Sequence, residues 1–512
     1  MRAALVALAL VCGCAATPRA ESPVKNLSIP VRDPSQAAPS DDDTREDPPE
    51  SDPSRPLGTP TIVRARLATG TELVVAPVRG APIVEVRLVL PAAGSSADGD
   101  HTGLALVAAE LALESGAGKT SAKDFAARRQ ALARPLAAHV SLDATVLSLA
   151  VPRETLEDAL DLVSLVLRDA KLDPLALARV TRRARVDRAV RGRGDATWIA
   201  AMLAHRELHK LPASMHPYAA FDATGAEIDR VALADAKTFV KQRWVPNGAS
   251  LVLVGDVDAA DARALAERAL AAWKGVDPPV SSFTAPVMAD GLRVLVADLP
   301  GATTSELVVG ALVAERTDEA WPALDVGTTA IEARLALALR DATPLAAKTY
   351  GELVEVAHGP SSWVTHAFAE AGRTGAVASV LLDELHRAVD AAPTDAELVS
   401  ARRRIELEVA TRFGAPRPLA DALAHTAALR GMENVPDRQL ARVRQVDAVA
   451  VQRATRGHLG GLLLLVVGDA TRVAPLLTRL GEVTVVSPDR GFERVRTLAA
   501  DAVAPVEPRA AP

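Results

Sequence analysis

Two histidines, His205 and His209, stand at a spacing that could bind a metal ion. They are four residues apart in a stretch with helical periodicity, which would place both imidazoles on one face of a helix. Between them, Glu207 is not at the spacing that zinc-binding helices use for a general base. We interpret the pair as polar residues of a helix surface and keep a zinc site at His205 and His209 as the alternative.

Both cysteines of the chain, Cys12 and Cys14, lie in residues 1–14. The rest of the chain therefore has no disulfide, cysteine nucleophile or thiolate metal ligand. Residues 1–14 begin with one arginine and an apolar run too short to span a bilayer, which is typical of a signal peptide. Val11-Cys12-Gly13-Cys14 resembles the bacterial lipobox. That resemblance implies a lipid anchor on Cys14 and, with Ala15 next to it, the periplasmic side of the outer membrane.

Composition narrows the class of protein. At 512 residues the chain is too long for one ordinary domain, and 49% hydrophobic residues indicate a mainly globular body. Lys and Arg number 58 against 64 Asp and Glu, so the formal net charge of -6 provides no basic field, and we expect no nucleic-acid partner. Residues 15–58 combine many prolines with acidic clusters, and we expect them to form a disordered tether.

The body after the tether repeats itself. Val254-Gly255-Asp256 returns as Val467-Gly468-Asp469, and two longer stretches correspond in the same order. The body is therefore predicted to be a tandem duplication. The expected parts are an N-terminal half at 59–275, a linker at 276–290, a C-terminal half at 291–490 and a flexible tail at 491–512.

Within the first half, β-type runs precede and follow long helical stretches. The expected strands are 61–67, 72–78, 82–90, a pair within 135–151, and 249–254; the expected helices are 103–115, 154–169, 173–192, 195–210 and 258–273. Strands and helices that come in runs, without strict alternation, predict an α+β fold. We expect each half to be a sheet with one face covered by helices.

The order of several short motifs resembles the pitrilysin/insulinase family of zinc peptidases. The motifs are Gly103-Leu104-Ala105, Glu114-Ser115-Gly116, His216-Pro217-Tyr218, and Trp244-Val245-Pro246-Asn247 through Val254-Gly255-Asp256. The resemblance covers roughly residues 60 to 490 and implies that family's duplicated sheet-plus-helices fold. Active members follow Gly-Leu-Ala with His-x-x-Glu-His, in which two His bind zinc and the Glu acts as general base.

In this chain the resemblance breaks at the catalytic pentad. Leu106 and Glu110 stand where the family has its two zinc-binding His, and Ala109 stands where it has the base. The position of the third ligand falls nearest to Asp187. Two oxygen ligands without imidazole make a poor zinc site, so we expect no metal, no cofactor and no catalytic residue at these positions.

The family resemblance also points to two residues in the second half. Leu339-Arg340-Asp341 and Tyr350-Gly351 resemble the family's Arg and Tyr signatures, which implies that Arg340 and Tyr350 bind the main chain of a peptide substrate.

Three functions remain open. The first is a non-catalytic subunit that binds peptide or unfolded polypeptide and partners a zinc-bearing homologue. The second is a zinc metallopeptidase with a relocated metal site, for instance at His205 and His209. The third is a purely structural subunit.

Overall fold

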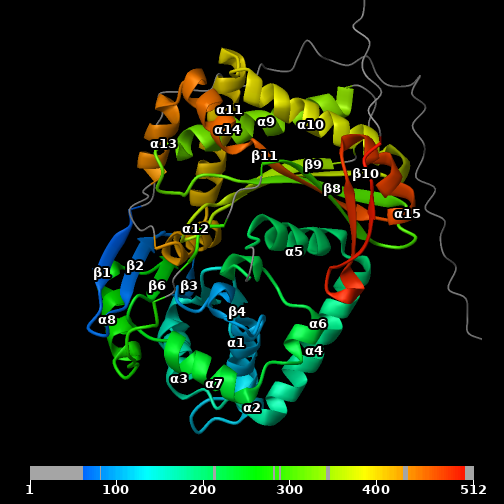
Figure 1. The fold of residues 1–512 in the computed structure, drawn as a ribbon. Coiled ribbons are helices and arrows are strands. Elements are labelled where there is room, and N and C mark those ends of the chain that lie inside the picture. Colours follow the sequence, from blue (N-terminus) through cyan, green and yellow to red (C-terminus); the bar gives the residue numbers. More distant parts are fainter. Residues whose placement is uncertain are drawn as a thin grey trace, which may run out of the picture. The chain divides into compact units, whose positions relative to one another are not determined.

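The computed structural model describes residues 61–501, except for 81, 212–214, 281–282, 287–289, 342–345, 347 and 431–435. The expected signal peptide, Cys14 and the expected tether therefore lie outside the described residues. The described chain folds around two β-sheets, one in each half (Figure 1). No helix in this part of the chain combines the length and hydropathy needed to cross a bilayer.

The N-terminal sheet has six strands in the order β1-β2-β6-β3-β5-β4. It is mixed, because β2 runs parallel to β6 whereas β3 pairs antiparallel with both β6 and β5. The strands are β1 (Val63–Arg66), β2 (Glu72–Pro77), β3 (Ile83–Leu90), β4 (Arg134–Val140), β5 (Thr145–Pro152) and β6 (Ser250–Gly255). The helices of this half are α1 (Leu104–Glu114), α2 (Ala122–Gln130), α3 (Leu156–Asp169), α4 (Pro174–Gly194), α5 (Ala196–Leu208), α6 (Gly225–Ile228), α7 (Leu233–Arg243) and α8 (Ala259–Leu270).

The C-terminal sheet has seven strands in the order β13-β12-β7-β11-β8-β10-β9. The strands are β7 (Gly291–Asp298), β8 (Thr304–Leu312), β9 (Lys348–Val354), β10 (Ser362–Glu370), β11 (Gly461–Gly468), β12 (Val483–Ser487) and β13 (Glu493–Leu498). The helices are α9 (Trp321–Asp341), α10 (Thr374–Asp390), α11 (Asp395–Phe413), α12 (Pro416–Ala428), α13 (Pro436–Gln445), α14 (Ala448–His458) and α15 (Ala470–Val473).

The two sheets confirm the predicted α+β class and the tandem duplication. In chain order, β2 to β6 of the first half match β7 to β11 of the second, and in space the orders β2-β6-β3-β5-β4 and β7-β11-β8-β10-β9 are the same. Each half keeps an aliphatic core between its sheet and its own helices. That agrees with the very low aromatic content of the sequence, 3%.

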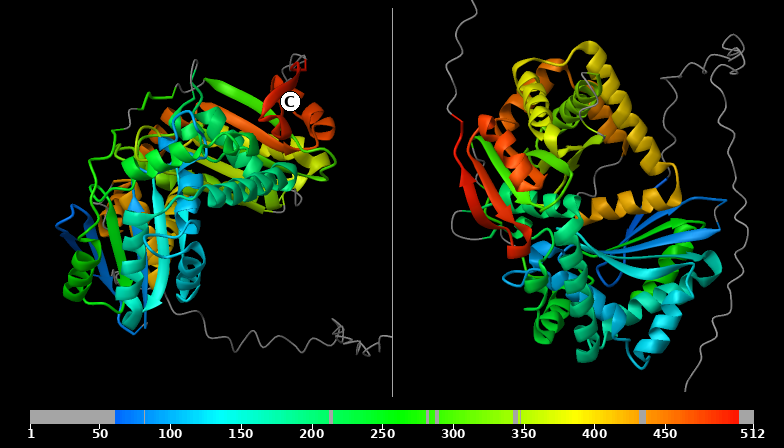
Figure 2. Two further views of the ribbon diagram at one scale, coloured as in Figure 1. Left: turned by 90° about the horizontal axis from the view of Figure 1, so that it is seen from below. Right: turned by 90° about the vertical axis from the view of Figure 1, so that its right-hand side faces the viewer.

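Helices of the same half cover one face of each sheet, as predicted, but the opposite face is covered as well. Helix α5 of the first half packs on β8 and β11 of the second sheet, where Leu203 meets an apolar face that includes Val308 and Leu465. Helix α12 of the second half packs on β3 and β6 of the first sheet, with Leu419 against Val252. The halves therefore exchange one helix each, which Figures 1 and 2 show from three directions. Both faces of each sheet are therefore covered, because a helix of the other half packs on the face that the sheet's own helices leave open.

The predicted flexible tail, residues 491–512, also needs correction in its first part. Residues 493–498 form β13, which pairs antiparallel with β12 through a register shift at Val485 and Val486. Five of the six residues of β13 are exposed, so the strand has no buried alternation that would distinguish it from a loop in the sequence. Residues 502–512 lie outside the described residues.

Candidate functional site: a cavity between the two halves

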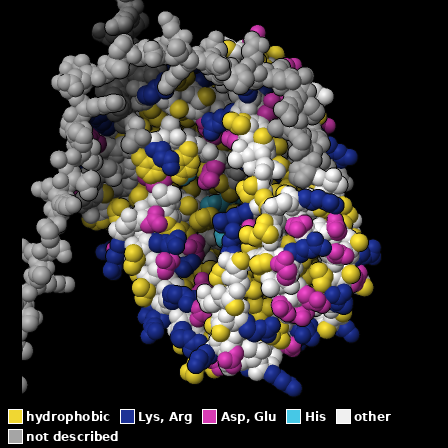
Figure 3. Space-filling model, turned by 180° about the vertical axis from the view of Figure 1, so that it is seen from behind, with side chains coloured by type: hydrophobic (Ala, Val, Ile, Leu, Met, Phe, Trp, Pro, Cys, Tyr) yellow, Lys and Arg dark blue, Asp and Glu magenta, His cyan; other side chains and the backbone are white. Residues whose placement is uncertain are grey.

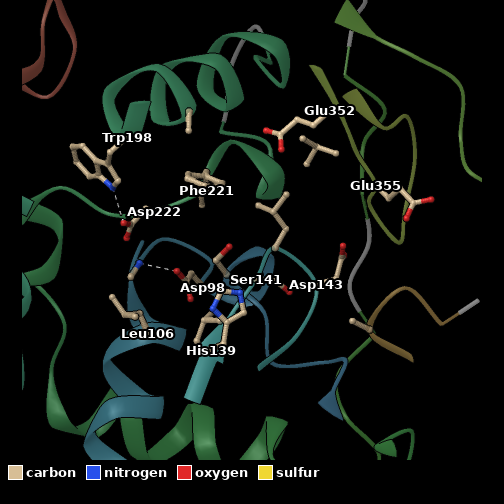
Figure 4. Close-up of a pocket in the computed structure, with 18 of the residues that line it drawn as sticks. Asp98, Leu106, His139, Ser141, Asp143, Trp198, Phe221, Asp222, Glu352 and Glu355 are labelled. Atoms are coloured by element: carbon tan, nitrogen blue, oxygen red, sulfur yellow. Dashed lines mark hydrogen bonds between the residues drawn. The ribbon is translucent and has the colours of Figure 1, made fainter. Parts of the chain in front are cut away.

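A cavity of about 720 Å³ lies where the two halves meet. The N-terminal half contributes α1, α4, α5, the turn between β4 and β5, and residues 220–222. The C-terminal half contributes the end of β9 and α12. The strands β4 and β9 are the outermost strands of their sheets, and both border the cavity (Figure 4). An extended chain inside it could therefore meet an unpaired strand edge.

Helix α1, which carries the degenerate pentad, is held at its start by Asp98. The carboxylate of Asp98 accepts hydrogen bonds from the backbone N–H of Gly103 (2.6 Å) and of Ala105 (2.7 Å). Gly103 has a φ of 91°, and a Cβ there would lie 2.7 Å from the Ile228 side chain, so only glycine fits. Burial raises the pKa of Asp98 to about 7, although these backbone hydrogen bonds lower it. This carboxyl fixes the helix that faces the cavity.

The side chains of the pentad cannot assemble a zinc site. Leu106 lines the cavity and Ala109 is fully buried. Glu110 is hydrogen-bonded to Arg183 of α4, and the same guanidinium bonds to Glu114 at 2.5 Å. The hydrogen bond to Glu110 raises the pKa of Arg183. Glu110, the one carboxylate at the pentad positions, is therefore paired with a cation on α4.

Asp187, the residue nearest to the expected position of the third zinc ligand, is also paired with arginines. Its carboxylate contacts Arg191 at 2.9 Å and Arg188 at 3.3 Å. Arg188 in turn pairs with Asp222 at 2.9 Å, and Asp222 accepts a 2.9 Å hydrogen bond from Trp198 Nε1 (Figure 4). Within the described residues, no group of three or more His, Cys, Asp or Glu side chains is arranged to hold a metal ion. The residues present do not fit zinc.

The histidine pair of the alternative reading is buried, so its interpretation as helix-surface residues is wrong. His205 is 6% exposed and His209 is 1% exposed. Their rings stack 5.7 Å apart in a row of aromatic side chains that also contains Phe221 and His216. Burial lowers the pKa of His205 to about 4 and that of His209 to about 3. Both imidazoles are therefore neutral packing elements near pH 7.

This burial predicts a pH dependence of stability. A neutral imidazole in the folded state and a normal pKa of about 6.5 in the unfolded state mean that the unfolded chain takes up more protons as pH falls. The contribution of His209 is complete above pH 6.5 and is lost as pH falls toward its folded pKa. Between pH 7 and pH 5 this loss is about 2 kcal/mol. We expect His209→Gln to be less stable than the wild type at pH 7 and to lose about 2 kcal/mol less on acidification.

Urea unfolding at pH 7 and pH 5 measures this difference. The exposed His139→Gln variant is the matched control and should keep the wild-type pH dependence. An unchanged loss of stability in His209→Gln would show that His209 is accessible to protons in the folded protein.

The tyrosine of the His216-Pro217-Tyr218 motif joins the two halves. Its hydroxyl donates to Asp143 at 2.6 Å and accepts from the backbone N–H of His358 at 3.0 Å. The other Asp143 oxygen accepts from the N–H of Ala357 at 3.1 Å. Tyr218 is completely buried, and Phe283 of the linker segment stacks on its ring. In this chain the motif therefore connects the two halves beside the cavity.

The predicted substrate-binding pair lies in the second half. Arg340 is exposed near the end of α9. Tyr350 is half-buried on β9, where its ring stacks on His366 at 4.6 Å, and His366 Nδ1 is 2.8 Å from Glu306 Oε1. The cavity is lined by Glu352 and the next two residues of the same strand, and neither Arg340 nor Tyr350 is among the described residues of its wall. Substrate binding by this pair stays a prediction.

Several cavity residues were missed by sequence reasoning. Asp98 lies five residues before Gly103, too far from the first residue of the helix for the helix-start signal of an acidic N-cap. Trp198 and Asp222 are 24 residues apart and have no such local signal. The same holds for Glu355 and His425, which form a 2.8 Å contact in the part of the cavity wall that the C-terminal half contributes.

Comparison with known proteins supports the family resemblance. Residues 230–405, which include parts of both halves, match the family model described as Peptidase M16 inactive domain. No curated protein matches the chain.

Solved structures share the fold. A peptidase M16 inactive domain from Pseudomonas fluorescens superposes with a TM-score of 0.69 at 19% identity, covering 80% of this chain and 98% of that one. The periplasmic protease PqqL from Escherichia coli gives 0.64 at 15% identity, covering 82% of this chain but 47% of its own length. A chain of Complex III2 from Candida albicans gives 0.67 at 13% identity, covering 81% and 99%. One of these structural relatives, the chain of Complex III2, is thus part of a complex.

Proposed function

We propose that this chain, a pitrilysin-family homologue with a peptidase M16 inactive-domain segment, is a non-catalytic subunit that binds extended peptide for a zinc-bearing partner. One observation carries the proposal. The positions of the zinc motif are filled by Leu106, by buried Ala109 and by Glu110 paired to Arg183, while the cavity beside them persists. A chain that had lost both chemistry and ligand would have no reason to keep 720 Å³ of open volume.

The cavity suits an extended polypeptide. The outermost strands β4 and β9 can each donate and accept main-chain hydrogen bonds, as in other cases of strand addition. Apolar side chains on its wall, among them Leu142, Phe221 and Leu353, can contact side chains of an unfolded segment. Arg340 and Tyr350 lie outside the described wall of this cavity. On the family resemblance we propose them as further donors for peptide carbonyl groups, since a guanidinium offers a fork of N–H groups and a phenol one directional hydroxyl.

One structural relative supports a partner. A chain of this fold occurs within Complex III2. We therefore propose a heterodimer in which a homologue with His-x-x-Glu-His supplies the zinc and the general base.

Co-expression with such a homologue tests the proposal. The two chains should co-purify, and the peptidase activity of the pair should exceed that of the homologue alone. Arg340→Ala together with Tyr350→Phe should weaken peptide affinity by tenfold or more, because each desolvated contact contributes about 1 to 3 kcal/mol. The exposed Arg403→Ala of α11 is the matched control and should change nothing. A homologue that is fully active alone would favour the purely structural subunit.

We also propose that the chain is anchored by lipid on Cys14 to the periplasmic side of the outer membrane. The support is the short apolar run that ends at Gly13-Cys14 and the Pro-rich segment behind it. A Cys14→Ser variant should leave the membrane fraction, since a chain without acyl groups has no anchor and a single one already binds marginally. Full retention of the variant in washed membranes would contradict the lipid anchor.

A further inference from the structure

A second cavity of about 500 Å³ lies inside the C-terminal half. Helices α9, α11, α12 and α13 enclose it together with the end of β9. It is separate in position from the first cavity, but the two share a wall made of Leu353, Glu355 and His425. Neither the degenerate zinc motif nor the predicted pair of Arg340 and Tyr350 reaches it, so the proposed function leaves this cavity unexplained.

Part of the charge in this cavity is already neutralised. Glu355 contacts Arg316 Nε at 3.1 Å and His425 Nε2 at 2.8 Å. Burial raises the pKa of Glu355, but these two partners outweigh it and hold the pKa below its usual value. Asp421 bonds to Arg87 Nε of the first sheet at 2.8 Å. These carboxylates therefore serve the structure and are not free for a ligand.

Two arginines of the cavity lack ion-pair partners of this kind. Arg438 and Arg442 stand four residues apart on α13, so both lie on one face of the helix, and both line the cavity. Neither forms an ion pair or hydrogen bond with any residue that the structure describes. Arg412 of α11 lies on the same cavity and reaches a carboxylate only at 4.0 Å, that of Glu408. Two to three guanidinium groups are therefore available to an anionic ligand group.

One carboxyl group of the cavity forms no ion pair with a described residue. Asp325 of α9 lines the cavity, and its carboxyl group is hydrogen-bonded to Gln439. Burial raises the pKa of Asp325 to about 6, although this hydrogen bond and the more distant charge of Arg412 lower it. Trp321, one helical turn earlier, and Phe413 of α11 add aromatic surface to the same wall.

We propose that this second cavity binds a small zwitterion, an amino acid or short peptide, with its carboxylate on Arg438 and Arg442 and its ammonium group on Asp325. The guanidinium pair matches a carboxylate in geometry, and the lone carboxylate prefers a positive donor over a second anion. Trp321 and Phe413 provide the apolar contact for a side chain. The volume of the cavity fits a ligand of this size, since small-molecule pockets start at about 300 Å³.

Isothermal titration of the purified full chain, without any partner, tests the proposal. The probes are L-phenylalanine, the dipeptide Phe-Phe, phenylacetate without the ammonium group, phenethylamine without the carboxylate, and inorganic phosphate. A zwitterion should bind at least tenfold more tightly than phenylacetate, phenethylamine or phosphate. Phosphate or phenylacetate binding as tightly as the zwitterions would overturn the proposal in favour of a simple anion site. No binding of L-phenylalanine or of Phe-Phe at millimolar concentration would also overturn it.

Variants locate the site. Arg442→Gln should weaken zwitterion binding by tenfold or more, and Asp325→Asn should remove the preference for zwitterion over phenylacetate. The matched control is Arg444→Gln on the same helix, whose guanidinium pairs with Glu406 at 2.7 Å and is not part of the cavity wall. Thermal unfolding shows which variants remain folded. Unchanged binding in both folded site variants would contradict the assignment. Because the assay needs neither the partner nor a peptidase substrate, its outcome is independent of the proposed function.

Discussion

Replacing Glu85 by Ala should lower the free energy of unfolding by about 3 kcal/mol or more. Glu85 and Arg87 are both nearly inaccessible, and their side chains meet at 2.9 Å on β3. Without Glu85 the buried guanidinium keeps Asp421 of α12 as its remaining carboxylate, and that group is half exposed. A buried guanidinium that keeps only a half-exposed carboxylate is incompletely compensated, which is costly, so the junction between the first sheet and the exchanged helix α12 should weaken.

The duplication supplies an internal comparison for this variant. Glu306 occupies the equivalent position on β8 and is also buried, but it bonds to His366 Nδ1 and to the hydroxyl of Thr197 of α5, both at 2.8 Å. Glu306→Ala should therefore cost less, about 1 to 3 kcal/mol, because the groups left behind carry no permanent charge. Glu72→Ala, which removes a surface contact of 3.7 Å with Arg64, should cost about 1 kcal/mol or less.

Urea unfolding followed by circular dichroism ranks the three variants. The order Glu85, Glu306, Glu72 is the expected one. A Glu85→Ala variant that is no less stable than Glu72→Ala would show that the buried pair does not hold the two halves together.

Restoring the zinc motif should succeed only if Arg183 is also replaced. The triple change Leu106→His, Ala109→Glu, Glu110→His rebuilds the pentad but leaves the guanidinium of Arg183 beside it, where it now contacts Glu110 and Glu114. A positive charge that close opposes a divalent cation. We expect the triple variant to bind far less than one zinc per chain, and the further change Arg183→Glu to raise zinc toward one equivalent, since it supplies a third ligand.

Metal analysis after dialysis against micromolar zinc measures the difference. The triple variant combined with Arg179→Glu, an exposed arginine one turn earlier on α4, is the matched control and should stay low. Stoichiometric zinc in the triple variant alone would show that Arg183 moves aside freely.

The parts of the fold that depend on local sequence patterns could be predicted from the sequence. The apolar run of Ser250–Gly255 and the corresponding run of Gly461–Gly468 are strands because both faces of each are buried, and their repetition exposed the duplication. The loss of the pentad was also visible, since Leu106 and Ala109 cannot ligate a metal in any fold.

What the sequence did not reveal depends on partners far apart in the chain. The exchange of α5 and α12 places Leu203 and Leu419 on the sheets of the opposite halves, and no periodicity within a helix says which sheet it will cover. His205 and His209 have the spacing of surface residues on a helix, and only the packing of Phe221 and His216 around them makes them buried. The role of Arg183 likewise appears only when α1 and α4 lie side by side.

The central claim is that this chain binds peptide without cleaving it, and the most direct test uses the purified chain alone. Zinc content and hydrolysis of a mixed peptide library are measured on the same sample, beside a peptide-binding assay. The account predicts far less than one zinc per chain, no hydrolysis and measurable peptide binding. One zinc per chain together with hydrolysis that disappears in His205→Gln or His209→Gln would contradict it and establish a relocated metallopeptidase site.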